Sequence, residues 1–532
     1  MTKVLVTGEL HPIAIELMRK EGLEVDVHAL LEEDKIIEII KNYQGIVTRS
    51  QTAVNKSIID AGVQLKVIGR AAIGVDNIDV DYATKKGVLV VHVPSDNVVS
   101  AAEHTIALLL SAIRNLGAAG ALLKSGKWSR KEFVGSELLN KKLGIIGLGK
   151  VGSHVAKIAH AFGMDIYAYD PYISKEKFEK HHAIKVDNLN DLLTQVDILT
   201  IHTPKTKTTL GMLDYLNLKE MKQGSVLINC ARGGIVDEDA LFRLLNEGHI
   251  AKAGIDVFAQ EPIINHPLFS HPNCVCTPHL GASTIEAQFR VGRTIAKQMV
   301  KALKNQVVDH PVNMPLVEGE IFPHSRAFCS LAEKMGCIAS QLTKFNPSFM
   351  RMIISGKDLG DQSDLLKAAY FKGFFQNSTE ARVNYINSAQ IALDRNLNLE
   401  MIKDPLHETY SHLLKIEIYG DGEPVTLSGT VFATKSRIVE LSGYSMDIEP
   451  EGNMLLIKNQ DVPGMIGFVG GLLGDHKINI ARWELGRKKQ GGEALSFLLL
   501  DQVIDDEIKV KLTDHESIIQ VTSLDLSFND EN

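Results

Sequence analysis

The stretch that most constrains the fold runs from Lys142 to Asp170, KLGIIGLGKVGSHVAKIAHAFGMDIYAYD. It opens with an apolar run typical of a buried parallel strand, followed by Gly147, Gly149 and Gly152 in G-x-G-x-x-G spacing. Apolar residues then recur at helical spacing, and a second short strand is predicted before the final aspartate. A strand, a glycine turn, a helix, a strand and a terminal carboxylate in this order predict a doubly wound, parallel α/β sheet.

The residues of this turn have the properties needed to bind a dinucleotide. Gly147 permits the tight turn, Gly149 lets the backbone approach a pyrophosphate, and Gly152 lets helix and strand pack closely. Lys150 and Val151 begin the helix, whose N-terminus offers free N–H groups and a positive dipole end to phosphates. A glycine turn with a purely structural role is the alternative, and the surrounding strands, helix and acid in register make it the weaker one.

Asp170 indicates which dinucleotide binds. Its carboxylate can accept hydrogen bonds from both hydroxyls of the adenine-side ribose, and its charge repels a 2′-phosphate. The next residues, Pro171 and Tyr172, bring no arginine to receive such a phosphate. We therefore expect NAD rather than NADP.

Composition narrows the class of protein. The 532 residues suffice for three or four domains. The formal net charge of −8 and the lack of a basic run argue against a nucleic-acid partner. The N-terminus predicts a first strand rather than a signal peptide, and no apolar run approaches the ~20 residues of a membrane span. Five sparse cysteines predict reduced thiols in a cytoplasm; we interpret Cys274-x-Cys276 as core thiols and expect no metal site.

The first 95 or so residues predict a second doubly wound sheet, without a dinucleotide fingerprint. We interpret it as a substrate domain because polar residues follow its strands, where open α/β sheets bind ligands. Arg49 follows one strand, and Arg70 is the second residue of the glycine-containing stretch GRAAIGVD (69–76) after another. Two arginines so placed predict an anion clamp; solvated surface charges are the alternative. Asn77 is expected to cap a helix over 78–86.

Residues 98–116 predict a strongly apolar helix that connects the two sheets and packs at a dimer interface. His104 lies inside it, and a buried or interface histidine is favoured there over a functional one. The following loop contains Arg130 and Lys131, whose cations can reach over a neighbouring active site.

In the second sheet, polar residues again follow strands, on the same edge as the glycine turn. Three of them suit the oxidation of a 2-hydroxy acid. Arg232 has the planar fork that holds a carboxylate, His279 can take the hydroxyl proton, and Glu261 can orient that histidine. Each has a purely structural alternative: Arg232 could bond a turn, Glu261 could lie in a surface loop, and His279 could cap the following helix. The other candidates at this edge are His202, Thr203, Pro204, Cys230, Ala231 and Asp256, the last for the nicotinamide carboxamide or else as a cap.

The motifs GLGKVG, HTP, NCARGGIVDEDAL, GIDVFAQEP and TPHLGAST, with GRAAIGVDNID earlier in the chain, resemble the D-isomer-specific 2-hydroxyacid dehydrogenases. The resemblance implies that Arg232 binds substrate, that His279 is the acid and base, and that Glu261 supports it. It assigns Arg49, Arg70 and Asn97 to the substrate side and suggests that Arg130 or Lys131 meets a substrate phosphate. The implied activity is NAD-dependent oxidation of D-3-phosphoglycerate, the first step of L-serine biosynthesis.

The C-terminal half resembles the regulatory part of the longer members. Residues 427–444 predict a pair of strands in an intervening domain. Residues 453–526 resemble an ACT domain, a βαββαβ module that senses amino acids, and the resemblance places an effector at Asp461 and Asn479. Asn459 is expected at the same effector site, but some serine-sensitive relatives carry Tyr or His at this position, so an L-serine response stays open.

The complete expectation is a substrate domain over 1–98 and 286–315, an NAD domain over 99–285, an intervening domain over 316–450 and a ferredoxin-like ACT domain over 453–526. A homodimer or homotetramer is expected. Two alternatives remain: a hydroxypyruvate or glyoxylate reductase of the same family, and a non-catalytic NADH-sensing protein. Side activity on 2-hydroxyglutarate also stays open.

Overall fold

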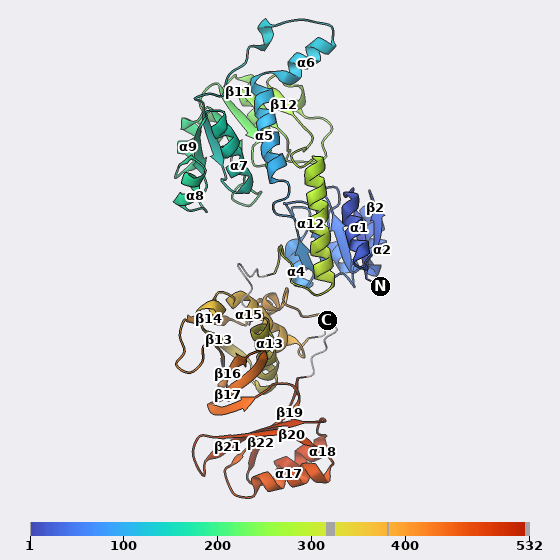
Figure 1. The fold of residues 1–532 in the computed structure, drawn as a ribbon, viewed down its shortest axis with the longest axis vertical. Coiled ribbons are helices and arrows are strands. Elements are labelled where there is room, and N and C mark those ends of the chain that lie inside the picture. The colour runs from blue at the N-terminus through green and yellow to red at the C-terminus, as the bar shows by residue number, and fades with distance from the viewer. Residues whose placement is uncertain (1, 315–324, 380–381, 527–532) are drawn as a thin grey trace. The chain divides into compact units, whose positions relative to one another are not determined.

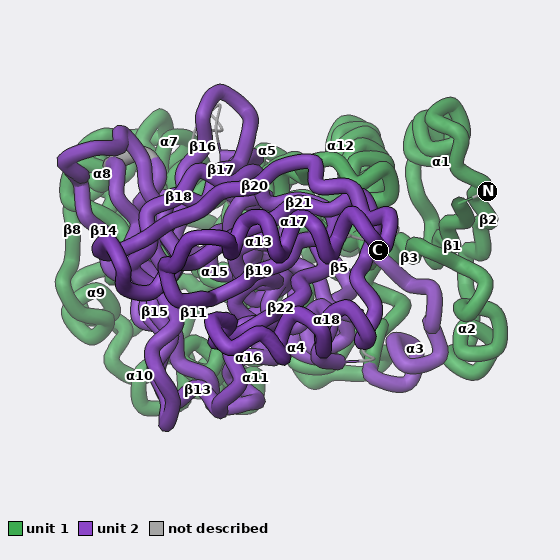
Figure 2. Tube along the Cα trace, turned by 90° about the horizontal axis from the view of Figure 1, so that it is seen from below, with its two compact units in different colours: residues 1–55, 68–78, 91–310 green, residues 56–67, 79–90, 311–532 purple. Residues whose placement is uncertain are grey.

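The computed structural model describes residues 2–314, 325–379 and 382–526 (Figure 1). The chain divides into two compact units, one made of residues 1–55, 68–78 and 91–310, the other of residues 56–67, 79–90 and 311–532 (Figure 2). The predicted boundary at 315/316 lies outside the described residues. The predicted domain limits stay predictions, although each of the four sheets takes its strands from one of the four predicted ranges.

The first sheet has the strand order β2-β1-β3-β4-β5, that of flavodoxin-like folds. Its central pairs are parallel, with Val4 opposite Gly45 and Thr7 opposite Thr48. Strands β1, β3, β4 and β5 are buried along their centres, as expected where both faces of a parallel sheet are covered, whereas the edge strand β2 carries Asp26 at its centre. Its elements are β1 (Lys3–Thr7), α1 (Pro12–Lys20), β2 (Glu24–His28), α2 (Glu33–Ile39), η1 (Ile40–Asn42), β3 (Gly45–Thr48), α3 (Lys56–Ala61), β4 (Val67–Arg70), α4 (Val80–Lys85) and β5 (Leu89–Val91).

One capping prediction in this sheet is wrong. Helix α4 is capped by Asp79, whose side chain accepts from the N–H of Tyr82. Asn77 instead donates to the backbone carbonyls of Arg49 and Thr52, and so holds the loop that follows β3.

The second sheet has the order β12-β11-β10-β9-β6-β7-β8. Read across the sheet from β8, the six strands β8-β7-β6-β9-β10-β11 have the order 3-2-1-4-5-6 of dinucleotide-binding domains. The order reverses between β6 and β9, which pair in parallel. Two separate apolar cores cover its faces. Its strands are β6 (Lys142–Ile146), β7 (Asp165–Tyr169), β8 (Ala183–Lys185), β9 (Ile198–Ile201), β10 (Ser225–Asn229), β11 (Ile250–Ile255) and β12 (Cys274–Cys276).

The predicted helix over 98–116 is two helices. Helix α5 (Val98–Ile113) ends before Asn115, whose left-handed backbone (φ 53°) starts α6 (Leu116–Lys124). Among the described residues no single helix has the length and apolarity to cross a membrane; the bent pair α5 and α6 passes by length and composition alone. The other helices between α6 and residue 303 are η2 (Lys131–Phe133), α7 (Lys150–Ala161), α8 (Lys175–Lys180), α9 (Leu189–Gln195), α10 (Tyr215–Lys219), α11 (Glu238–Asn246), η3 (Pro267–Ser270) and α12 (Ile285–Leu303).

The other unit contains a mixed sheet of order β14-β13-β15-β16-β17-β18, with β13 and β14 parallel and the remaining pairs antiparallel. The predicted strand pair within 427–444 is confirmed as β16 and β17. The elements are α13 (Ser325–Leu342), β13 (Pro347–Ser355), α14 (Lys357–Gly360), α15 (Ser363–Phe375), α16 (Ser388–Asp394), β14 (Leu399–Asp404), β15 (Leu413–Gly420), β16 (Val425–Phe432), β17 (Lys435–Leu441) and β18 (Tyr444–Ile448).

The last sheet is antiparallel and has the ferredoxin-like order β20-β21-β19-β22. Two helices cover one of its faces (Figure 1). The opposite face, which includes Met454, Leu456 and Phe497, joins the apolar core around α13. Its elements are β19 (Gly452–Gln460), α17 (Met465–Asp475), β20 (Ile480–Arg487), β21 (Glu493–Leu500), α18 (Asp506–Thr513) and β22 (Ile518–Leu526).

Candidate active site

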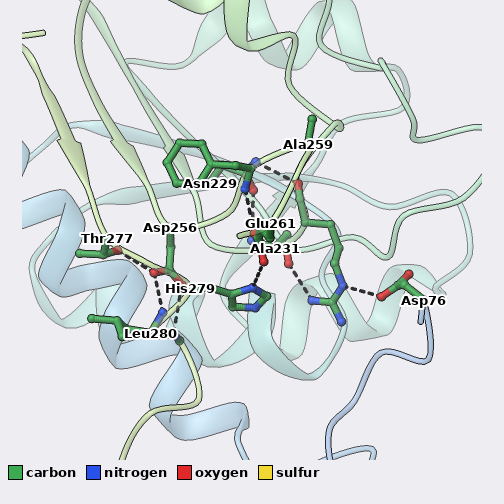
Figure 3. Close-up of polar contacts among 12 residues, drawn as sticks. Asp76, Asn229, Ala231, Asp256, Ala259, Glu261, Thr277, His279 and Leu280 are labelled. Atoms are coloured by element: carbon green, nitrogen blue, oxygen red, sulfur yellow. Dashed lines mark hydrogen bonds and ion pairs between the residues drawn. The ribbon is translucent and has the colours of Figure 1, made fainter. Parts of the chain in front are cut away.

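His279 and Glu261 form a hydrogen-bonded pair beyond the ends of neighbouring strands (Figure 3). His279 Nδ1 lies 2.7 Å from Glu261 Oε2, and Glu261 Oε1 accepts from the N–H of Phe258 at 2.9 Å. Burial by itself would raise the pKa of Glu261, but the bonds from His279 and Phe258 outweigh it and leave that pKa below its usual value. The glutamate therefore stays a carboxylate that orients the ring, and Nε2 is the ring nitrogen left to exchange a proton.

Arg232 stands on a turn built by Asn229. The Asn229 side chain accepts from the N–H of Ala231 at 3.0 Å and donates to the carbonyl of Arg232 at 3.1 Å. Arg232 donates through Nη1 to the Ala231 carbonyl at 2.7 Å and through Nε to Asp76 at 3.1 Å. Sequence reasoning missed the roles of Asn229 and Asp76. Asn229 ends β10, and an Asn at the end of a strand is a turn signal that would have revealed the first.

Two glycines permit this close arrangement. A Cβ on Gly74 would lie 2.1 Å from Arg232 Nη2, and one on Gly233 would lie 1.8 Å from the Phe258 carbonyl oxygen. Any side chain at either place would displace the guanidinium or the loop that leads to Glu261. The glycines of GRAAIGVD and NCARGG are thus required by packing.

Arg70 and Arg49 add positive charge near Arg232. Arg70 is 8% exposed and donates to the Gly74 carbonyl at 3.1 Å. Its burial, and then the charges of Arg49 and Arg232, lower the pKa of Arg70 to about 10, so it remains charged near neutral pH. Burial also lowers the pKa of Arg49, which donates to the Glu9 carbonyl at 2.8 Å. The structure thus brings three predicted substrate cations within electrostatic range of one another, as an anion site requires.

A cleft with about 380 Å³ of empty space lies next to Arg49. Among the residues that line it, Asn97 has a buried side-chain oxygen, Oδ1, without a hydrogen-bond partner in the described part of the chain. Buried polar atoms of this kind call for a bound polar group. The cleft is lined by Leu10, His11, Arg49, Ala71, Ala72, Asn97, Ala282, Gln288 and Val291.

The glycine turn fits a dinucleotide. Gly147 has φ 89°, and a Cβ there would lie 2.7 Å from the His202 carbonyl oxygen. A Cβ on Gly152 would lie 2.0 Å from the Gly147 oxygen, whereas none of the described atoms comes within 4 Å of one on Gly149. Gly147 and Gly152 are therefore needed by the protein itself, and the space at Gly149 is available to a ligand. Asp170 accepts from the N–H groups of Leu148 and Tyr172 (2.9 and 3.0 Å), which points its carboxylate at the turn.

The other predicted cofactor residues lie at the ends of β9 and β10. Burial lowers the pKa of His202 to about 3, so its ring is neutral, and Nε2 lies 3.0 Å from Thr200 Oγ1. Thr203 Oγ1 is buried without a partner among the described residues. Burial raises the pKa of Cys230 to about 12, which keeps it a thiol. Pro204 and Ala231 follow the same two strands, while Lys150 and Val151 begin α7.

Asp256 follows β11 and is fully buried. Its carboxylate accepts from Thr277 Oγ1 at 2.6 Å and from the N–H groups of Leu280 and Gly281 at 2.7 and 3.0 Å (Figure 3). These donors belong to the loop that carries His279. A contact with a nicotinamide carboxamide stays a prediction.

Arg130 and Lys131 are exposed in the segment between α6 and β6. Within the described part of the chain, neither contacts the other predicted site residues. The prediction that one of them meets a substrate phosphate remains a prediction.

The three predicted effector residues all have partners within the last sheet. Asp461 pairs with Arg487 at 3.1 Å, Asn479 donates to Asp501 at 2.8 Å, and the buried Asn459 donates to the Gln460 carbonyl. Asp461 and Asn479 retain further hydrogen-bonding capacity, whereas the Asn459 side chain is 4% exposed.

Comparison with known proteins shows two family matches. Residues 106–281 match the NAD-binding domain of D-isomer specific 2-hydroxyacid dehydrogenases, and residues 325–442 match the D-3-phosphoglycerate dehydrogenase intervening domain. The chain is 40% identical to D-3-phosphoglycerate dehydrogenase of Methanocaldococcus jannaschii (99% of this chain, 100% of the relative) and 36% identical to that of Bacillus subtilis (96% and 98%).

Solved structures of related folds cover somewhat more than half of the chain. A Thermus thermophilus protein is 32% identical, with a TM-score of 0.55, over 58% of this chain and 100% of its own. Aquifex aeolicus D-lactate dehydrogenase, solved with NAD and lactic acid, is 28% identical, with a TM-score of 0.53, over 59% and 100%.

Proposed function

The chain belongs to the D-3-phosphoglycerate dehydrogenases of the D-isomer specific 2-hydroxyacid dehydrogenase family, and from this premise we propose how its residues divide the reaction. The activity is NAD-dependent oxidation of D-3-phosphoglycerate to 3-phosphohydroxypyruvate, which leads into L-serine biosynthesis. The observation that carries the division of roles is the His279–Glu261 pair, which lies at the same sheet edge as Arg232 and the glycine turn.

Arg232 holds the substrate carboxylate. Its Nε and Nη1 are already engaged by Asp76 and by the Ala231 carbonyl, so Nη2 and the second Nη1 proton are available to the ligand. Arg49 and Arg70 supply further positive charge for a substrate that carries two anionic groups, a carboxylate and a phosphate.

His279 takes the hydroxyl proton at Nε2. The ring becomes cationic as the proton arrives, and Glu261, 2.7 Å from Nδ1, stabilises that charge. General base catalysis of this kind contributes ~10²–10⁴ in rate. Gly149, the start of α7 and Asp170 would hold the pyrophosphate and adenine-side ribose of NAD, which when bound would supply the hydride acceptor.

The C-terminal part supports regulation and assembly. The βαββαβ order of 452–526 supports an ACT module, in which Asp461 and Asn479 would meet an amino acid such as L-serine. The segment from α6 to β6 exposes large apolar side chains, which supports a dimer interface there; Leu116, Leu123, Trp128, Val134 and Leu139 are each at least 55% exposed. Pairing of ACT modules would extend the dimer to a tetramer. The five cysteines are all free, which suits the reducing cytoplasm we propose as the location.

The test is NADH formation from D-3-phosphoglycerate and NAD, with the product trapped, across an L-serine titration. Turnover that falls with serine supports both the catalytic and the regulatory assignments. Turnover that does not change with L-serine contradicts the proposal that L-serine is the effector. A protein that binds NADH but does not oxidise D-3-phosphoglycerate contradicts the division of roles. The alternatives would then be a hydroxypyruvate or glyoxylate reductase and a non-catalytic NADH-sensing protein.

A further inference from the structure

Helix α5 lies beneath the loop that carries His279 and contacts it through side chains. Ser100 Oγ lies 2.8 Å from Thr284 Oγ1, the residue that caps α12. One turn further along α5, His104 Nε2 lies 3.1 Å from Asp256 Oδ1 and 3.2 Å from Thr277 Oγ1. Side chains of α5 therefore contact the chain on both sides of His279, at Thr277 before it and at Thr284 after it.

Asp256 is the centre of this contact. Besides its three carboxylate bonds to Thr277, Leu280 and Gly281, its backbone carbonyl accepts from the N–H of His279 at 2.8 Å. One residue therefore fixes the loop on both sides of His279 and at His279 itself.

The loop needs to be held. His279 has φ 55°, a left-handed conformation that non-glycine residues adopt at an energetic cost and only when neighbours impose it. Small movements of such a base matter, because a shift of ~1 Å at a reacting group can cost ~10² in rate. The bonds from Asp256 supply the restraint.

His104 in turn holds Asp256. A fully buried carboxylate is costly unless it is hydrogen-bonded, and His104 Nε2, 3.1 Å from Asp256 Oδ1, is one of its donors. Burial alone would raise the pKa of Asp256, but hydrogen bonds led by His104 and Thr277 leave that pKa below its usual value. For this bond Nε2 of His104 must carry a proton.

We propose that His104 is a positioning residue for the dehydrogenase reaction: through Asp256 it fixes the 277–281 loop and thereby aims His279 at the substrate. The inference rests on the proposed function, since it presumes that His279 is the base. It assigns a role to a histidine that the sequence pattern favours only as a buried or interface side chain.

The test compares His104→Leu, which removes the donor, with His104→Gln, whose amide nitrogen can donate from nearly the same place. His160→Leu, an exposed histidine of α7, is the matched control. For each variant one measures kcat and KM for D-3-phosphoglycerate, the Kd of NADH by fluorescence, the Tm, and the isotope effect on kcat with substrate deuterated at C2.

A positioning role predicts that His104→Leu lowers kcat by ~10- to 100-fold, the scale of a misplaced reacting group. NADH affinity and KM change little, and the isotope effect on kcat rises because chemistry becomes slower than product release. His104→Gln and His160→Leu stay within a few-fold of the wild type and keep its isotope effect.

Equal kcat and isotope effects in the wild type and His104→Leu would overturn the inference. So would a loss of kcat in His104→Leu that His104→Gln does not restore. If His104→Leu fails to fold, His104→Asn replaces it, because its shorter amide cannot reach Asp256; activity of His104→Asn equal to that of His104→Gln would then overturn the inference. A wild type without turnover would instead refute the proposed function.

Discussion

Replacing Glu261 by Gln removes one charge from the pair that is proposed to perform proton transfer, while the amide keeps an acceptor for the Phe258 N–H. As His279 takes the substrate proton, the ring becomes cationic 2.7 Å from the carboxylate. At that distance two unit charges attract by ~1.5 kcal/mol in bulk water and by ~6 kcal/mol at an effective dielectric constant of 20.

The real environment lies between these limits. The His279 and Glu261 side chains are 43% and 32% exposed, so water screens the pair considerably. We take ~3 kcal/mol as the loss, which corresponds to ~10² in rate. Glu261→Gln should therefore lower kcat/KM for D-3-phosphoglycerate about 100-fold.

The assay is the initial rate of NADH formation at saturating NAD, with the NADH Kd measured separately by fluorescence. Glu247→Gln is the matched control: the same chemical change on a surface ion pair of α11, which should leave kcat/KM unchanged. A Glu261→Gln enzyme within about threefold of the wild type, with unchanged NADH affinity, would refute the reasoning.

Three further predictions follow from other residues. Gly149→Ala should fold with an unchanged Tm but lose NADH affinity, since the added methyl fills only the space proposed for the pyrophosphate; wild-type affinity in a fluorescence titration would contradict this. Asp76→Asn should lower the KM for D-3-phosphoglycerate ~2- to 5-fold, because a half-exposed ion pair of up to ~1 kcal/mol no longer competes for Arg232; a raised KM would show that Asp76 orients the arginine instead. The pKa of His202 is about 3 in the folded protein and 6.5 ordinarily, so on acidification the unfolded chain binds the proton first. The free energy of unfolding therefore falls by ~1.4 kcal/mol per pH unit as the pH drops from about 6.5 towards 3. The Tm of His202→Gln should therefore fall less than that of the wild type between about pH 7 and pH 5, and parallel falls would count against a buried neutral ring.

The parts of the fold that could be predicted are those governed by local pattern. The run 142–170 predicts β6, α7 and β7 because periodicity, glycine spacing and a terminal acid all agree. The break between α5 and α6 could not be predicted, because it depends on a single left-handed Asn115 inside an uninterrupted apolar run. The cap of α4 was misplaced because Asn77 and Asp79 are both good capping residues, and the tertiary contact of Asn77 with the β3 loop decides between them.

The candidate site shows the same division. The residues proposed to act on the substrate, Arg232 and His279, could be recognised from their side-chain chemistry and from their positions after predicted strands. Asn229 could have been recognised as a turn residue, because its side chain bonds residues only two and three positions further along the chain. Asp76 and His104 could not be recognised, because each acts through a partner brought near only by folding: Asp76 and Arg232 are 156 positions apart. Arg130 and Lys131 lie on a loop whose position no local pattern determines.

The most direct test of the central claim compares kcat/KM for D-3-phosphoglycerate and D-glycerate in the presence of NAD. The cationic site formed by Arg49, Arg70 and Arg232 predicts that the phosphorylated substrate is preferred by ~10²-fold or more, because each charge-assisted hydrogen bond is worth ~1.5–3 kcal/mol. Equal values for the two substrates, or no turnover of D-3-phosphoglycerate by a protein that binds NADH, would contradict the account.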